Sequence, residues 1–194
     1  MTTRENILKH SLHDFAFEGY GGASMAKIAE KSGITKSTIY SHFSSKEDIY
    51  LAVLDQFIHY SAQLWKDEKK RLETLHTESA LRETLFNVYK NAQQNRALTI
   101  FWHKSMISPP AKIQAEVMEK ISLPVQNMKD FLTHVFTKGI KNGDIPAEHN
   151  VPYLVNIFFG LVQCITLGHI FDEHTDPEKM IEDMFSYFWK GIGK

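Results

Sequence analysis

Cysteine is nearly absent from this chain, and no export signal is visible at its start. Cys164 is the only cysteine among 194 residues, so no disulfide can form within one chain. Its first fifteen residues, MTTRENILKHSLHDF, carry charged side chains where a secretory signal needs an unbroken apolar run. So little cysteine is typical of proteins in a reducing compartment. We therefore expect a cytoplasmic protein, whose 43% of hydrophobic residues suffices for a globular core.

The chain also lacks an excess of charge of either sign. It has 22 Lys and Arg residues against 23 Asp and Glu residues, which gives a net charge of −1 at pH 7. A strongly basic chain would indicate binding to nucleic acid through charge alone. Any case for DNA binding must therefore rest on the placement of particular side chains.

Motifs of catalysis are missing as well. The sequence contains no Gly-x-Ser-x-Gly, no His-Glu-x-x-His and no phosphate-binding glycine loop. Residues 24–27, SMAK, match the Ser-x-x-Lys pattern of penicillin-recognising enzymes, but the companion motifs are absent and Ser24 stands where a helix N-cap is expected. We expect no enzyme activity and no cofactor.

A metal site is the alternative interpretation of the stretch HIFDEHTD. It places His169, Asp172, Glu173 and His174 close together in the sequence. A helix would align His169 with Asp172 or Glu173, but His174 falls off that face, and exposed His and acidic residues are common at helix ends. We therefore expect no metal ligands there.

One long stretch has no charged residue. Residues 151–171, VPYLVNIFFGLVQCITLGHIF, have about the length of a membrane span. Asn156, Gln163 and His169 interrupt the stretch, Pro152 lies at its start, and no Lys or Arg anchors either edge. This pattern favours a buried or interface helix over a membrane helix.

Apolar periodicity and helix stop signals predict an all-α chain of about nine helices with no convincing strand. Ser24 is expected to cap the second helix, and Ser44 with Glu47 to form a capping box at the fourth. Pro124 should start or kink the second half of a long helix that Asn142-Gly143 ends. Further helices are expected over residues 4–18, 80–95, 97–108, 150–172 and 178–190.

The second and third helices have the spacing of a helix-turn-helix. Residues 24–43 contain a helix of two turns, a turn with Gly33, and the stretch GITKSTIYSHF, whose poor helix formers suit a contact surface. Ile34, Ile39 and Phe43 are expected to point into a core, and an ordinary helical hairpin is the alternative interpretation. In the helix-turn-helix geometry the second helix enters the major groove of DNA. The expected DNA contacts are Ser24, Lys27, Thr35, Lys36, Ser37, Thr38, Tyr40, His42 and Lys46.

The same stretch resembles a known family. The segment SMAKIAEKSGITKSTIYSHFSSKEDIYLAVL is similar to the DNA-binding segment of tetracycline-repressor (TetR) family regulators, and the resemblance covers roughly residues 4–58. Ser37 departs from the Gly or Pro of many members. The resemblance implies an all-α homodimer with a three-helix DNA-binding domain over residues 1–48, a connecting helix four at about 46–65, and a larger ligand-binding and dimerisation domain over 49–194.

Within the larger domain, the resemblance implies that the last two helices, 150–172 and 178–190, form a four-helix bundle with those of the partner. Candidate contact residues are Val155, Phe158, Phe159, Val162, Ile165, Leu167, Met180, Met184 and Phe188.

An effector pocket in the larger domain should be mostly apolar with a few polar groups, and plain core is the alternative for each residue. The expected lining residues are Phe86, Tyr89, Trp102, His103, Met106, Met128, Phe131, Phe158 and Gln163. His103, Asn156 and Gln163 are the candidate polar anchors.

These observations predict a ligand-responsive transcriptional regulator, most simply a repressor. It should bind a palindromic operator of double-stranded DNA as a dimer and be released by a small hydrophobic or aromatic effector. The alternative is a DNA-binding protein of the same fold without an effector, acting through a protein partner.

Overall fold

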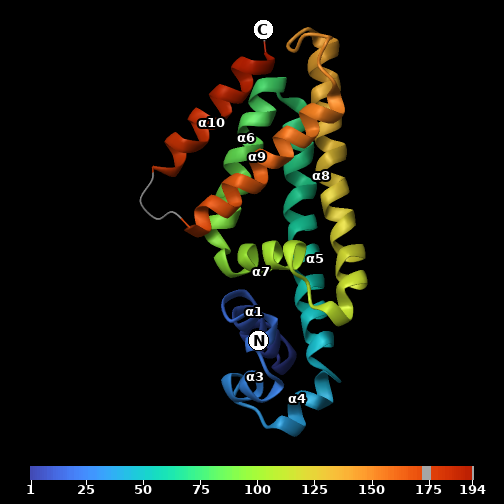
Figure 1. The fold of residues 1–194 in the computed structure, drawn as a ribbon, viewed down its shortest axis with the longest axis vertical. Coiled ribbons are helices and arrows are strands. Elements are labelled where there is room, and N and C mark those ends of the chain that lie inside the picture. The colour runs from blue at the N-terminus through green and yellow to red at the C-terminus, as the bar shows by residue number, and fades with distance from the viewer. Residues whose placement is uncertain (172–175, 194) are drawn as a thin grey trace. The chain divides into compact units, whose positions relative to one another are not determined.

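The computed structural model describes residues 1–171 and 176–193, and over these residues the chain is helical, without a β-strand. The fold class expected from the sequence is confirmed. Figure 1 shows the order of the elements, which are α1 (Thr3–Phe17), α2 (Gly19–Gly22), α3 (Met25–Lys31), α4 (Lys36–His42), α5 (Lys46–Thr74), α6 (Thr77–Gln94), α7 (Arg96–Ile107), the 3₁₀ helix η1 (Ala111–Ile113), α8 (Gln114–Asn142), α9 (Val151–Phe171) and α10 (Pro177–Ile192).

The helices group into two compact units. The N-terminal unit contains Met1–Ala62 and Arg96–Leu123, and the C-terminal unit contains Gln63–Asn95 and Pro124–Lys194. Packing therefore joins residues 96–123 to the DNA-binding segment, although the domain expected for them begins at residue 49. The division at residue 48 stays a prediction about function.

Aromatic side chains attach α7 to α1 and α5 in the N-terminal unit. The Tyr50 ring lies 5.0 Å from that of Phe15 and 4.8 Å from that of Phe101. Tyr50 Oη and Ser105 Oγ are 2.7 Å apart in a buried hydrogen bond. Helix α7 is thus part of the core that also positions the helix-turn-helix.

The start of α5 differs from the expected capping box. Because α5 begins at Lys46, Ser45 is the N-cap, and its Oγ accepts from the Asp48 N–H at 3.0 Å. The Asp48 carboxylate accepts from the Ser44 N–H at 3.1 Å. The expected Ser44 and Glu47 pair was wrong by one residue, since two adjacent serines followed by two adjacent acids allow both registers.

The C-terminal unit is built around one apolar cluster. Phe131, Phe136 and Phe158 are fully buried in it, and Trp65 packs edge-on against Phe131 at 5.0 Å. Gly143, with φ +82°, ends α8 where Asn142-Gly143 predicted a turn. Pro124 lies inside α8, at the boundary of the two units, so the helix does not start anew there.

Among the described residues, one helix has the length and composition of a membrane span, Val151–Gly168 within α9. Its side chains Leu154, Phe158 and Ile165 belong to the buried core of the C-terminal unit. Burial of these side chains is what a core helix requires, and the interface role of residues 151–171 stays a prediction.

Candidate DNA-binding surface

Helices α3 and α4 lie side by side and are joined by a tight turn (Figure 1). Gly33 adopts φ +68°, a left-handed conformation that costs other residues strain. The Gly33 N–H donates to Glu30 O and the Ile34 N–H to Ala29 O, both at 3.0 Å. The Ser24 Oγ accepts from the Lys27 N–H at 3.3 Å, which confirms Ser24 as the N-cap of α3. The sequence therefore folds locally into a helix-turn-helix.

Helix α4 has one buried face and one exposed face. Ile39 is fully buried and Phe43 is 5% exposed, so both anchor α4 as expected from their spacing. The predicted contact residues Thr35, Lys36, Ser37, Tyr40 and His42 are exposed, and Thr38 is half-buried. The exposed face thus carries hydroxyl, phenol, imidazole and ammonium groups, which can bond to base edges and phosphates.

Hydroxyl groups form a small network at the start of α4. Thr35 Oγ1 accepts from the Thr38 N–H at 3.2 Å and lies 2.8 Å from both Ser37 Oγ and Thr38 Oγ1. Thr35 is therefore the N-cap of α4, which the sequence reasoning had missed. Because Thr35 Oγ1 caps the helix and also lies within bonding distance of two other hydroxyls, a contact with DNA would have to replace its bond to Ser37 or Thr38.

Asp14 of α1 and Glu18, the residue that follows α1, form ion pairs with α3. Lys31 Nζ lies 2.5 Å from Oδ1 of the fully buried Asp14 and 3.1 Å from Glu18 Oε1. These two carboxylates raise the pKa of Lys31. Lys27 Nζ lies 3.6 Å from Glu18 Oε2, so this exposed, predicted DNA contact also has an intramolecular partner. The fixed pairing of α1 and α3 sets the position from which α4 projects.

Lys46 has partners within the chain. Its Nζ donates to Tyr20 O at 2.6 Å and Ala23 O at 2.9 Å, and lies 4.0 Å from the centre of the Tyr20 ring. Partial burial lowers the pKa of Lys46. Two of its three N–H donors are used, so one remains for the predicted phosphate contact.

The predicted effector residues fall into two groups. Trp102, His103 and Met106 lie on α7 in the N-terminal unit, where His103 is 5% exposed and burial lowers its pKa. The other six belong to the C-terminal unit. Phe131 and Phe158 are fully buried in its core, Tyr89 is buried there, Phe86 and Met128 pack against the core, and Gln163 is half-buried on α9.

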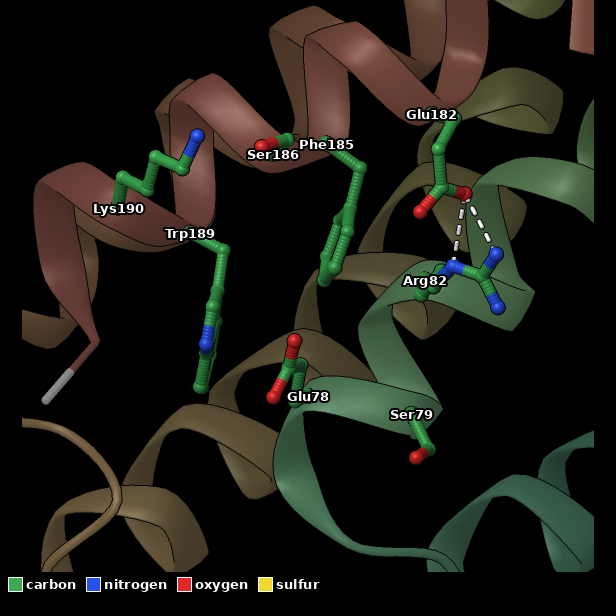
Figure 2. A pocket seen from close by; sticks show the side chains of 8 residues that line it. All are labelled: Glu78, Ser79, Arg82, Glu182, Phe185, Ser186, Trp189 and Lys190. Atoms are coloured by element: carbon green, nitrogen blue, oxygen red, sulfur yellow. Dashed lines mark hydrogen bonds and ion pairs between the residues drawn. The ribbon is translucent and has the colours of Figure 1, made fainter. Parts of the chain in front are cut away.

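The C-terminal unit has a groove on its surface, away from the predicted effector residues. A groove of about 510 Å³ lies between α6 and α10, and none of the nine predicted effector residues lines it. In Figure 2, Phe185 and Trp189 project from α10 toward Glu78 of α6, and the Arg82 guanidinium donates to Glu182 Oε2 at 2.8 and 2.6 Å. The groove lining is Glu78, Ser79, Arg82, Glu182, Phe185, Ser186, Trp189 and Lys190.

No group of three His, Cys, Asp or Glu side chains within the described part of the chain could hold a metal ion. The alternative metal set involves Asp172, Glu173 and His174, which lie outside the described residues, as does the side chain of His169.

Comparison with known proteins gives matches to one family. Residues 7–53 match the family model described as "Bacterial regulatory proteins, tetR family". The chain is 21% identical over 162 residues to the HTH-type transcriptional regulator LuxR of Vibrio harveyi, covering 84% of this chain and 76% of that protein. It is also 21% identical over 198 residues to the fatty acid metabolism regulator protein of Bacillus subtilis, covering 96% of this chain and 93% of that protein.

Solved structures share the fold along the whole chain. The regulator FadR from Bacillus subtilis in complex with stearoyl-CoA superposes with a TM-score of 0.76 at 20% identity, covering 97% of this chain and 98% of that chain. The ketosteroid regulator KstR2 of Mycobacterium tuberculosis gives a TM-score of 0.76 at 15% identity, covering 100% of this chain and 96% of that chain. At these identities the likeness concerns the fold.

Proposed function

Because the chain belongs to the tetR family of bacterial regulatory proteins, we propose that it is a repressor that binds a palindromic operator as a dimer and is released by a small-molecule effector. Like its relatives, the protein regulates transcription by binding DNA and is not an enzyme. The observation that carries the proposal is the exposed polar face of α4, held in place by the buried Ile39 and Phe43. Bacterial relatives of this kind also support a cytoplasmic location.

The proposed DNA contacts divide by chemistry. Thr35, Lys36, Ser37 and Thr38 lie at the N-terminal end of α4, which enters the major groove in helix-turn-helix proteins. These side chains are proposed to bond base edges. The proposed phosphate contacts, which fix orientation without reading sequence, are Ser24, Lys27, Tyr40, His42 and Lys46.

We propose that α9 and α10 form the dimer interface. Tyr153 and Ile157 on α9 are 69% and 55% exposed, and Tyr187 on α10 is 75% exposed. Large apolar and aromatic side chains on the surface of one chain are typical of an interface with another chain. A dimer presents two α4 helices, which must be about 34 Å apart to enter successive major grooves.

We propose an apolar effector that binds in the larger domain and changes this separation. The abundance of Phe and Met side chains in and around the C-terminal core supports a ligand with a long or flat apolar portion. FadR of Bacillus subtilis, which has the same fold, has been solved in complex with stearoyl-CoA, so long-chain acyl-CoA is the first probe to test. A ligand that favours a different spacing of the α4 helices lowers operator affinity without touching DNA.

The test is a footprint of the purified protein on the DNA upstream of its own gene. Protection of a palindromic site at moderate salt is expected, and the protection should weaken when the correct effector is added. If no palindromic site is protected, the repressor proposal fails.

Complete burial of two predicted effector residues favours a second candidate. Phe131 and Phe158, both proposed to touch the effector, are fully buried among other core side chains. A regulator with a filled core would act through a protein partner instead. The two candidates differ in one measurement, because only the first predicts that a small apolar ligand raises the melting temperature and releases the DNA.

A further inference from the structure

Half of the basic side chains of the DNA-binding segment make no hydrogen bond or ion pair within the described structure. Residues 1–48 are all described, and their basic residues are Arg4, Lys9, Lys27, Lys31, Lys36 and Lys46. Carboxylates or backbone carbonyls engage Lys27, Lys31 and Lys46. Within the described structure, the other three form no hydrogen bond or ion pair. Arg4, Lys9 and Lys36 therefore keep all their N–H donors available to an external partner, and their positions decide which of them can meet DNA.

Arg4 differs from Lys9 and Lys36 because its side chain forms a cation–π contact with an aromatic ring. Its guanidinium carbon lies 5.0 Å from the centre of the Phe43 ring. Phe43 is the residue that ends α4, and it is 5% exposed. The charge of Arg4 therefore lies beside the C-cap of α4, the helix proposed to enter the major groove.

The backbone that carries Arg4 is fixed at both sides. Thr2 and Glu5 form a reciprocal capping box, with Thr2 N–H donating to Glu5 Oε2 at 2.8 Å and Glu5 N–H donating to Thr2 Oγ1 at 3.2 Å. Asn6 Nδ2 donates to Ser32 O at 2.9 Å, which ties the first turn of α1 to the turn between α3 and α4. The position of Arg4 relative to α4 is thus set by hydrogen bonds and not by the long side chain alone.

The chemistry of this arrangement suits a phosphate. A guanidinium held against a ring contacts it through its carbon and π-system, and the Arg4 N–H groups form no hydrogen bond to any residue that the structure describes. Such a fork matches two oxygens of one phosphate, and its orientation is fixed before DNA binds. We propose that Arg4 contacts a backbone phosphate of the operator beside the end of α4, outside the predicted set of DNA contacts. The inference rests on the proposed operator binding and adds a contact that positions the protein without reading sequence.

The test compares Arg4→Gln with the parent protein in a salt series. Binding to a duplex containing the footprinted site is measured by fluorescence anisotropy. Loss of one phosphate contact lowers the steepness of the dependence of log affinity on log salt by about 0.9, hence by about 1.8 for a dimer. We expect this change together with roughly tenfold weaker binding that is the same for operator and unrelated DNA.

Two matched variants serve as controls. Lys9→Gln removes the same charge from α1 but lies about 140° around the helix from Arg4, so the slope should stay parental. Arg4→Lys keeps the charge and loses the planar fork, so the slope should stay near parental while affinity falls. Circular dichroism melting of each variant reports the fold separately.

The outcomes separate the inference from the proposed function. A parental slope for Arg4→Gln, with normal operator binding by the parent, would overturn the Arg4 contact and leave the repressor intact. An equal loss of slope for Lys9→Gln would show a general charge effect and also overturn it. A parent that binds no duplex would overturn both.

Discussion

His103 illustrates how burial of one side chain makes stability depend on pH. The ring is 5% exposed on α7, and burial lowers its pKa in the folded protein. In the unfolded chain a histidine takes up a proton near pH 6.5. As the pH falls below this value, the unfolded state binds more protons than the folded state, so the free energy of unfolding decreases.

The free energy of unfolding of the parent should decrease as the pH falls from about 7 to about 5, and we expect this decrease to be smaller in His103→Gln. Urea denaturation at a series of pH values measures the free energy of unfolding. The matched control is His134→Gln, which changes an exposed histidine on α8 and should leave the pH dependence as in the parent. An unchanged pH dependence for His103→Gln would contradict the expectation.

The side chains of α4 should differ in what their loss does to specificity. Lys36→Ala and Thr35→Ala remove groups proposed to meet bases, so they should weaken operator binding by about 1–3 kcal/mol and relax base preference. Tyr40→Ala removes a proposed phosphate contact, so binding to all sequences should weaken alike. Competition binding against single-base operator variants measures the difference. If all three variants bind like the parent, α4 is not the recognition helix.

Lys46 shows where sequence reasoning about the site reached its limit. The exposure of Ser37 and Tyr40 followed from the helical period set by Ile39 and Phe43, whereas Thr35 and Lys36 stand near the buried face by that period and are exposed because they lie at the very start of α4. The carbonyls that Lys46 meets belong to Tyr20 and Ala23, beside the unexpected short helix α2. A backbone carbonyl has no residue-type signal, so a sequence does not indicate which lysine it engages.

At the scale of helices, the hydrogen bond between Tyr50 and Ser105 joins α5 to α7. Ser105 Oγ donates to Phe101 O at 2.8 Å, so it is free to accept from the Tyr50 hydroxyl. Ser105→Ala leaves the buried Tyr50 hydroxyl without this acceptor, which should cost about 1–3 kcal/mol. Adding Tyr50→Phe removes the orphaned hydroxyl, so the double variant should be no less stable than Ser105→Ala alone.

Denaturant unfolding of the parent, both single variants and the double variant measures this coupling, expected at about 0.5–3 kcal/mol. Additive effects would mean that the hydrogen bond does not hold α7 against α5.

Most helices were predictable because apolar periodicity and Gly or Pro signals agree. The sequence predicted 4–18 and 178–190, and the structure has Thr3–Phe17 and Pro177–Ile192. It did not predict α2 or η1, because four or three residues are too few to show a period. The N-cap of α5 was misplaced since Ser44 and Ser45 are chemically equivalent caps.

At the scale of the whole chain, the grouping of helices was not visible in the sequence. Helix α7 follows α6 directly, yet it packs with α1 and α5 in the N-terminal unit. Apolar spacing on α7 shows that one face is buried but not which helix buries it. For the same reason the predicted effector residues, chosen by composition, divide between the two units.

Dimerisation through α9 and α10 is predicted for the whole molecule. Ile157 is 55% exposed on α9, so Ile157→Asp should hardly change the stability of one subunit but should place a charge in the proposed apolar interface. Sedimentation velocity should show a monomer where the parent is a dimer. Operator affinity should fall by about 10²–10⁴-fold because the two half-sites are no longer bound by one linked molecule.

The matched control is Met118→Asp, which changes an exposed apolar residue of α8 in the N-terminal unit and should leave the protein dimeric. A dimer that survives both Ile157→Asp and Tyr187→Asp would place the interface elsewhere, and the spacing of the two α4 helices would then have to be set by other helices.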